Sequence, residues 1–593
     1  MNSKDLKSFY QSRYEQSSRH TKQINKKIKW IGFLRLVFII LAVFLIIKGV
    51  KLDMWALNIS GALLFLLFFR LVSIHKNFSE LRKKLEKLTM INQQELLAMK
   101  GDFSSFDNGS SYLNPEHEFT YDLDIFGEKS LFQYINRTCT NIGEKRLKDE
   151  FISSAKTKEE ILETHVILKE LSTQQEMMQN YRATGMLTED SESDRNEIIS
   201  WMSNQKLKFS YFVKFLVYAL SIVNSALLVA SIINSEYFGF LIISLVLSWF
   251  FYGLFMVRIN RYHSNITKKQ SIINKYLKLS RIISDTDFQH DALSIIQMQS
   301  KNSIKKLREL DLLMNFLDTR LNLLAGVILN TFFLSDFHII MKMEKWKENY
   351  KNDIPDFFAS HAEFDMLISK SVFSFNHPDF CWPKLSEEDF VSKEIGHPLL
   401  HSSKRVCSDF SINEEENVIL ITGANMAGKS TFLRTVGANL ILAGMGIKVC
   451  ANEFTFSPDK IITGMRTTDS LAESESYFFA ELKRLQRIVD GLSKGDRYFI
   501  LLDEILKGTN STDKHIGSEA LIRQLVKTNA KCLIASHDLE LGKLQDEFPD
   551  NIRNYHFESV IDKDELVFDY KLQTGIAQNM NASFLMKKMG IIR

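Results

Sequence analysis

The sequence predicts a multidomain protein in which two α-helical hairpins of membrane-spanning length belong to an all-α region, and an α/β domain follows. Three observations lead to this prediction. Four long apolar runs occur as two pairs, amphipathic helical patterns surround them, and short apolar strands alternate with helices after about residue 385. At 593 residues, the chain is long enough for several domains and a large core.

Composition excludes several classes of protein. Lys and Arg (74) nearly balance Asp and Glu (71), so the chain is neither a strongly basic nucleic-acid coat nor a highly acidic one, and any DNA contact must be local. The five cysteines lie far apart without a CxxC pair, which argues against a disulfide framework or a zinc ribbon and suits a reducing compartment. Seven prolines and 24% charged residues argue against long disordered regions.

The apolar runs predict two membrane hairpins, one in residues 30–70 and one in residues 211–257. With Trp30 to Leu34 ahead of a single Arg35, the first run reaches the roughly 20 residues that a bilayer requires. The second pair is free of charge within its runs, and a three-residue break separates them. Buried core helices are the alternative interpretation. The four runs are residues 36–47, 55–69, 215–233 and 237–257.

Basic residues flank both hairpins on the side away from their turns. Residues 1–29 carry eight Lys or Arg, and residues 70–87 carry six more. The turn of the second hairpin contains only Glu236, whereas Lys and Arg lie before and after that hairpin. By the positive-inside rule we expect a multi-pass protein of the cell membrane, with four transmembrane helices and the rest of the chain in the cytoplasm.

Residues 71–210 and 258–385 are predicted to form the first and second parts of one helical core, which the second hairpin interrupts. Apolar residues recur there at three- and four-residue spacing, as in residues 76–100 and 265–325. The uncharged run 321–334 is too short for a fifth span, and we expect it to form a buried core helix.

A phosphate-binding loop is predicted early in the last segment, residues 386–593. The apolar residues 417–422 read as a buried strand, which runs directly into the loop and then into a helical pattern. Backbone N–H groups of such a loop close around phosphates, Lys429 can reach the β and γ phosphates, and Ser430 can bind Mg²⁺. The alternative to a phosphate-binding loop is a glycine turn that arose by chance. The loop residues are Gly423, Ala424, Asn425, Met426, Ala427, Gly428, Lys429, Ser430 and Thr431.

Two further strands end in polar residues. Strand 498–502 ends in Asp503 and Glu504. If this strand lies next to the first, Asp503 would hold Mg²⁺ and Glu504 would polarise the attacking water. Strand 531–535 precedes His537, which at the ligand crevice of an α/β sheet could sense the γ-phosphate. Alternatively, Asp503 and Glu504 could be solvated acids on the surface, and His537 could have a structural role. We therefore predict an ATP and Mg²⁺ site with Lys429, Glu504 and His537 as catalytic residues.

Together these motifs resemble the MutS-type ATPases of the ABC group of P-loop proteins. The loop GANMAGKST resembles the family's phosphate loop, with Ala424 and Ala427 in place of the usual proline and glycine. Residues 503–513 resemble the segment that joins the magnesium site to the dimer partner, and residues 535–541 match the family's switch. Residues 471–481 resemble the signature, with Glu475 at a position where the family often has arginine.

The resemblance implies an ABC-type ATPase domain that works as a homodimer. ATP bound by one subunit would meet Ser476 of the other subunit. Residues 122–127 and 136–147 are more weakly similar to the start of the MutS core. The first 95 residues do not match the family's mismatch-recognition and connector domains, so we expect a membrane-anchored variant that lacks both. Residues 78–80 (FSE) share the letters of the mismatch wedge but lie in a helical pattern.

The leading hypothesis is a membrane-anchored, dimeric MutS-like ATPase that clamps structured, branched or mismatched DNA. The family's DNA-clamping core and the basic residues 301–308 motivate it, although those charges could be a solvated helix face. A cassette-driven machine for transport or membrane remodelling is an alternative, but its spans would be split and the LSGGQ signature is absent. A nucleotide-gated membrane scaffold that binds no DNA is the other.

Overall fold

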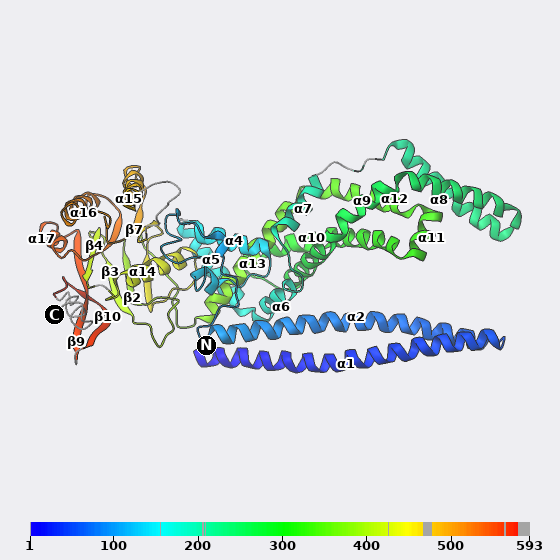
Figure 1. The fold of residues 1–593 in the computed structure, drawn as a ribbon, viewed down its shortest axis with the longest axis horizontal. Helices are drawn as coiled ribbons and strands as arrows, with labels where there is room; N and C mark the ends of the chain where they lie inside the picture. Colours follow the sequence, from blue (N-terminus) through cyan, green and yellow to red (C-terminus); the bar gives the residue numbers. More distant parts are fainter. Residues whose placement is uncertain are drawn as a thin grey trace.

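The computed structural model describes residues 2–153, 156–203, 207, 209–424, 426–466, 477–562 and 565–578. The molecule is elongated, with helices at one end and the α/β domain at the other (Figure 1). In the described residues, every strand follows the last helix of the helical part. That part comprises α1 (Ser3–Lys51), α2 (Trp55–Ala98), η1 (Ser110–Tyr112), α3 (Leu131–Ile135), α4 (Asn141–Ile152), α5 (Lys158–Thr173), α6 (Gln175–Gly185), α7 (Glu192–Ser203), α8 (Tyr211–Ile233), η2 (Ser235–Tyr237), α9 (Phe238–Ser284), α10 (Asp291–Asp318), η3 (Thr319–Leu321), α11 (Leu323–Phe333), α12 (Ser335–Tyr350) and α13 (Asp353–Asn376).

Helices α1 and α2 form a long antiparallel hairpin. Asn2 begins α1 with a capping box, in which its side chain accepts from the Asp5 amide and Asp5 accepts from the Asn2 amide. Near the turn the two helices approach closely, because a Cβ on Gly61 would lie 2.6 Å from Cγ1 of Ile46 and 3.0 Å from the Ala42 carbonyl oxygen. Small residues at a helix contact allow such an approach.

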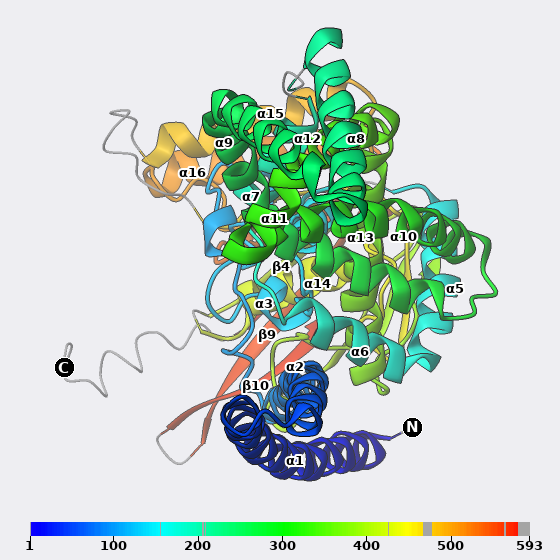
Figure 2. The same ribbon diagram turned by 90° about the vertical axis from the view of Figure 1, so that its right-hand side faces the viewer.

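Within the described residues, four helices are long and apolar enough to cross a membrane: α1, α2, α8 and the first part of α9. The number rises to five if the bent pair Asp291–Leu321 and Ala325–Phe333 is one span. Only 6%, 6%, 11% and 28% of the most apolar windows of the four helices are buried inside the protein, so these segments are not core helices of this chain. Both hairpins extend toward the end of the molecule opposite the α/β domain (Figure 1). Seen from that end, α1 and α2 lie apart from α8, α9 and α11 (Figure 2).

Helix α11 packs against α8 and α9, and it is bent by 107° from the preceding helical segment. The expectation of a buried core helix is wrong for its outer face, because Val327 and Ile328 are exposed. The inner face packs against α8 and α9. There the fully buried Asn224 donates to Ser248 Oγ at 2.9 Å and to the Thr331 carbonyl oxygen at 3.3 Å. This amide joins three helices rather than lining a path.

The polar end of the hairpin is fixed in the helical core by buried charges. Glu95 of α2 accepts from Arg137 Nε at 2.8 Å, Arg182 at 3.1 Å and Asn376 at 2.9 Å. Burial alone would raise the pKa of Glu95, but the two guanidinium groups hold it below its usual value. Tyr10 of α1 donates to Asn376 Oδ1 at 2.6 Å. Both helices of the hairpin are therefore attached to the C-terminal end of α13.

The α/β domain contains two mixed sheets. The smaller sheet has the order β1-β5-β2-β3, and the larger has the order β10-β9-β4-β8-β7-β6, parallel except for its edge strand β10. The elements are β1 (Lys384–Leu385), β2 (Phe390–Ile395), β3 (Ser408–Ile412), β4 (Val418–Gly423), α14 (Lys429–Gly444), β5 (Glu453–Phe456), β6 (Lys460–Gly464), α15 (Tyr477–Ser493), β7 (Tyr498–Asp503), α16 (Ser511–Leu525), β8 (Lys531–Ser536), η4 (Glu540–Lys543), α17 (Leu544–Glu547), β9 (Ile552–Asp562) and β10 (Glu565–Thr574).

The strand order corrects one expectation. The strand that carries Asp503 does not lie next to the strand before the phosphate loop, because β8 pairs with both and separates them. Helix α14, which follows the loop, contacts both β8 and β7. The helix, rather than direct strand pairing, therefore brings the loop to the end of β7.

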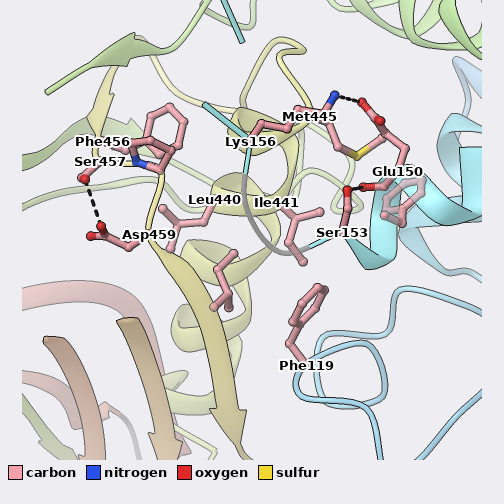
Figure 3. Close-up of a pocket in the computed structure, with 14 residues that line it drawn as sticks. Phe119, Glu150, Ser153, Lys156, Leu440, Ile441, Met445, Phe456, Ser457 and Asp459 are labelled. Carbon is pink, nitrogen blue, oxygen red and sulfur yellow. Dashed lines mark hydrogen bonds and ion pairs between the residues drawn. The ribbon is translucent and has the colours of Figure 1, made fainter. Parts of the chain in front are cut away.

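One continuous hydrophobic core joins the helical part to the α/β domain. Helix α14 fits closely there, because a Cβ on Gly437 would lie 2.7 Å from Leu123 and 2.8 Å from Leu501. A cavity of about 30 Å³ remains at this junction, with Glu150 on one side and Asp459 on the other (Figure 3). It has room for about one water molecule, so it is a packing gap rather than a ligand site.

The buried charges at the hairpin root predict a stability difference between two substitutions in α2. Glu95→Gln leaves two buried guanidinium groups without a counter-charge and should lower the free energy of unfolding by about 3–5 kcal/mol. Denaturant unfolding in detergent, followed by tryptophan fluorescence, measures this change. The matched control is Glu86→Gln, because Glu86 forms a solvent-exposed pair with Arg82 on the same helix. Equal losses in the two variants would contradict the assigned role of Glu95.

Candidate active site

The phosphate loop needs glycine at two positions. Gly423 has φ +145° and ends the fully buried strand β4; a Cβ there would lie 2.6 Å from the Phe557 carbonyl oxygen. Gly428 has φ +115° and precedes α14. L-residues with side chains rarely adopt these angles, so glycine at these two positions lets the chain turn between strand and helix. Asn425 lies outside the described residues.

The other loop residues divide into buried and exposed. Ala424 and Ala427 pack inside the domain, whereas Met426 is 80% exposed and Thr431 is also exposed. The two alanines, which differ from the usual family residues, therefore lie against the core. No side chain contact of theirs with a nucleotide is needed for phosphate binding, because the loop uses its backbone N–H groups.

Lys429 is buried at the start of α14. Its Nζ donates to the carbonyl oxygens of Gly423 at 2.8 Å and Ala424 at 2.9 Å, and it lies 3.4 Å from both ring nitrogens of His537. Burial lowers the pKa of Lys429 to about 8, although Glu504 and Asp503 act in the opposite direction. The ammonium group is thus held inside the loop, where phosphate oxygens would replace the two carbonyls as its partners.

Ser430 and Asp503 form the predicted magnesium pair. Ser430 Oγ donates to Asp503 Oδ2 at 2.7 Å. The second carboxylate oxygen, Oδ1, is buried and has no hydrogen-bond partner in the described part of the protein. An unsatisfied buried carboxylate oxygen beside a hydroxyl group fits a hard divalent cation that takes oxygen ligands, such as Mg²⁺.

Glu504 and His537 are in direct contact. His537 Nε2 lies 2.7 Å from Glu504 Oε1, and Lys507 Nζ lies 3.8 Å from the other carboxylate oxygen. The hydrogen bond from His537 is the main reason why the pKa of Glu504 falls to about 2. Glu504 is therefore ionised at neutral pH, and its backbone has a positive φ of 55°.

The sheet brings these groups together. Strands β4, β8 and β7 are parallel and in register, with Thr422 opposite Ser536 and Asp503 opposite Ala535. Their carboxyl ends therefore lie at one edge, where ligands bind in open α/β sheets. The Glu504 amide also donates to the Ala535 carbonyl oxygen at 2.9 Å. All three predicted catalytic residues lie at this edge: Lys429, Glu504 and His537.

The signature residue Ser476, like Glu475 and the rest of residues 467–476, lies outside the described residues. The neighbouring helix α15 is described, and its Glu481 accepts from the amides of Leu506 at 2.6 Å and Lys507 at 3.1 Å. The following segment contains Asn510, which caps α16 by accepting from the Asp513 amide at 2.8 Å.

Sequence reasoning missed Tyr570. This residue lies on the C-terminal hairpin of β9 and β10, and a Cβ on Gly428 would lie 3.3 Å from its ring. It is 47% exposed, has φ +55° and stacks on Phe568. A half-exposed aromatic ring beside a phosphate loop suits stacking on a nucleotide base. The register shift between Phe568 and Leu572 places it there, and no residue pattern signals that shift.

Part of the chain matches a known protein family. Residues 419–588 match the family described as MutS domain V. The chain is 33% identical over 232 residues to MutS protein homolog 4 of Mus musculus and 32% identical over 232 residues to its counterpart of Homo sapiens. It is 31% identical over 252 residues to the DNA mismatch repair protein MutS of Carboxydothermus hydrogenoformans.

These matches cover 37–41% of this chain. The chain spans only 23%, 30% and 24% of the length of the mouse, bacterial and human relatives. These matches are longer than residues 386–593, so the similarity to MutS proteins is not confined to the α/β domain. Within that domain, residues 419–588 resemble MutS domain V and carry the candidate ATP site.

Proposed function

We propose that this protein is a membrane-anchored MutS-like ATPase that hydrolyses ATP with Mg²⁺ in a composite dimer site to drive clamping on DNA. One observation carries the ATPase part of the proposal. The side chains of Lys429, Ser430, Asp503, Glu504 and His537 converge at the carboxyl edge of one parallel sheet. The match to MutS domain V supports the same assignment.

Each residue at this edge has a role that its position suits. Lys429 would hold the β and γ phosphates, and Ser430 with Asp503 would hold Mg²⁺, which when bound neutralises phosphate charge. Glu504, kept anionic, would orient and polarise the attacking water. His537, now bonded to Glu504 and near Lys429, would contact the γ-phosphate. Ser476 of a second subunit would complete the site.

Membrane anchoring is the second part of the proposal. Four helices of sufficient length and apolar character support it, as does their position at the end of the molecule opposite the α/β domain. Their apolar windows are mostly uncovered, and bare apolar surface of that size needs a lipid or protein partner. The basic flanks favour a multi-pass arrangement with the helical core and ATPase domain in the cytoplasm.

DNA clamping is the third part. The similarity to the bacterial relative, a DNA mismatch repair protein, supports it. On α10, Lys301, Lys305 and Arg308 are exposed on one face and available for phosphate contacts. Lys306 is not, because it pairs with Asp353 at 2.6 Å.

The test is ATP hydrolysis by the full-length protein purified in detergent, with and without linear, mismatched and four-way-junction DNA. Glu504→Gln serves as the blank. Stimulation by one form of DNA would support the clamp and identify its substrate class. Robust hydrolysis that no DNA changes would instead favour a membrane-remodelling or transport machine, or a nucleotide-gated scaffold.

Two substitutions at the site should have different effects. Lys429→Ala should abolish nucleotide binding, because the phosphates lose their buried cation. Glu504→Gln should still bind ATP, but its turnover should fall by about 10²–10⁴-fold because the water is no longer polarised, and the dimer should stay closed. Nucleotide binding, single-turnover hydrolysis and size-exclusion chromatography measure these outcomes. Wild-type turnover in Glu504→Gln would refute the assignment of the base.

Nucleotide affinity should depend on pH through Lys429. In the free protein the pKa of Lys429 is lowered to about 8, so its charge is present below pH 8 and is lost as pH rises through that value. ATP affinity should therefore fall between pH 8 and 9.5, by at most about tenfold per pH unit. Titration with a fluorescent ATP analogue measures it. Lys429→Arg, whose charge persists, is the control and should show no such fall.

A further inference from the structure

Helix α15 lies between the helical part of the protein and the loop that carries Glu504. Among its described side chains, residues 478–493, Ile488 is the only buried apolar one. A cavity of about 20 Å³ separates the helix from the sheet, lined by Glu481, Arg484, Asp503 and neighbouring residues. Phe478, Leu485 and Leu492 are partly buried against the core of the domain, so polar contacts and apolar packing together hold the helix in position.

On one side, α15 is bonded to the helical part through Arg484. Its NH2 lies 2.9 Å from Asp122 Oδ2, and its NH1 donates to the Arg466 carbonyl oxygen at 3.1 Å. Asp122 is fully buried, although it precedes Arg484 by 362 residues in the chain. It also accepts from Thr463 Oγ1 at 2.6 Å and from the Met465 amide at 3.0 Å.

On the other side, α15 holds the catalytic loop through Glu481. This residue stands three positions before Arg484, so both lie on the same face of the helix. The Glu481 carboxylate accepts from the amides of Leu506 and Lys507, directly after the segment of Glu504. Glu504 and Leu506 both have positive φ, of 55° and 60°, so the loop adopts a conformation that its residues do not favour by themselves.

We propose that Asp122 positions α15, and through Glu481 the loop of Glu504. Asp122, Arg484 and Glu481 are positioning residues, since they act on the site through α15. The inference rests on the proposed ATPase function.

The experiment uses the full-length protein in detergent and the variants Asp122→Asn, Arg484→Gln and Glu481→Gln. Three quantities are measured: kcat for ATP hydrolysis, KM for ATP, and the hydrogen exchange of the peptide that contains Leu506 and Lys507. We expect kcat to fall by about 2- to 30-fold with KM nearly unchanged, and the exchange of this peptide to become faster. The double variant Asp122→Asn/Glu481→Gln should be no worse than the poorer single variant, because both act through one element.

Arg484→Gln tests the contact with α15 in a protein that should still fold, because Asp122 keeps its other hydrogen-bond donors in that variant. The matched control is Asp459→Asn. Asp459 is also a largely buried acid paired with an arginine of the same domain, Arg497 at 3.1 Å, but Arg497 lies outside α15. The control should leave both kcat and the exchange of the loop peptide at wild-type values.

The outcomes separate this inference from the proposed function. Wild-type exchange of the loop peptide in Arg484→Gln would overturn the inference, whatever the ATPase activity. Faster exchange in a protein whose wild type hydrolyses no ATP would support the coupling and reject the ATPase. Additive losses of kcat in the double variant would also overturn the inference, because substitutions at independent sites have additive effects.

Discussion

Buried carboxylates hold the molecule together where distant parts of the chain meet. Glu95 joins the first hairpin to the core, Asp365 joins α13 to α4, and Asp122 joins the helical part to the α/β domain; each is at most 1% exposed. A carboxylate removed from water is costly unless cations and hydrogen-bond donors satisfy it. Each of these residues therefore fixes its partners in one arrangement, and the elements that carry those partners must meet.

Asp365 illustrates how local sequence serves such a joint. Its carboxylate accepts from the Thr140 amide at 2.9 Å and from Thr140 Oγ1 at 2.6 Å, at the start of α4. A Cβ on Gly143 would lie 2.2 Å from Asp365 Oδ2, so only glycine lets the two helices approach this closely.

The same architecture separates the apolar surface from the nucleotide site. The apolar hairpins extend toward one end of the molecule, and the α/β domain, which carries Lys429 and Glu504, lies at the other (Figure 1). Helix α9 alone has 47 residues, which at about 1.5 Å per residue extends roughly 70 Å.

Much of the local structure could be predicted from the sequence. The strands expected at 417–422, 498–502 and 531–535 are observed as β4, β7 and β8 with ends shifted by at most one residue. The long helices and the glycine turn also agree, because apolar periodicity and glycine geometry act over a few residues. The position of β8 between β4 and β7 was not predicted, since strand order depends on how crossover helices pack.

The sequence by itself determined the elements, the phosphate loop and the identity of the groups that meet there, because each follows from residue type and short-range spacing. Tertiary structure alone decided the Glu504–His537 contact, the placement of Tyr570 beside Gly428 and the bond between Asp122 and Arg484. These contacts join residues far apart in the chain. Their geometry is set by how whole helices and sheets bury apolar surface while satisfying charge, and no local pattern encodes that.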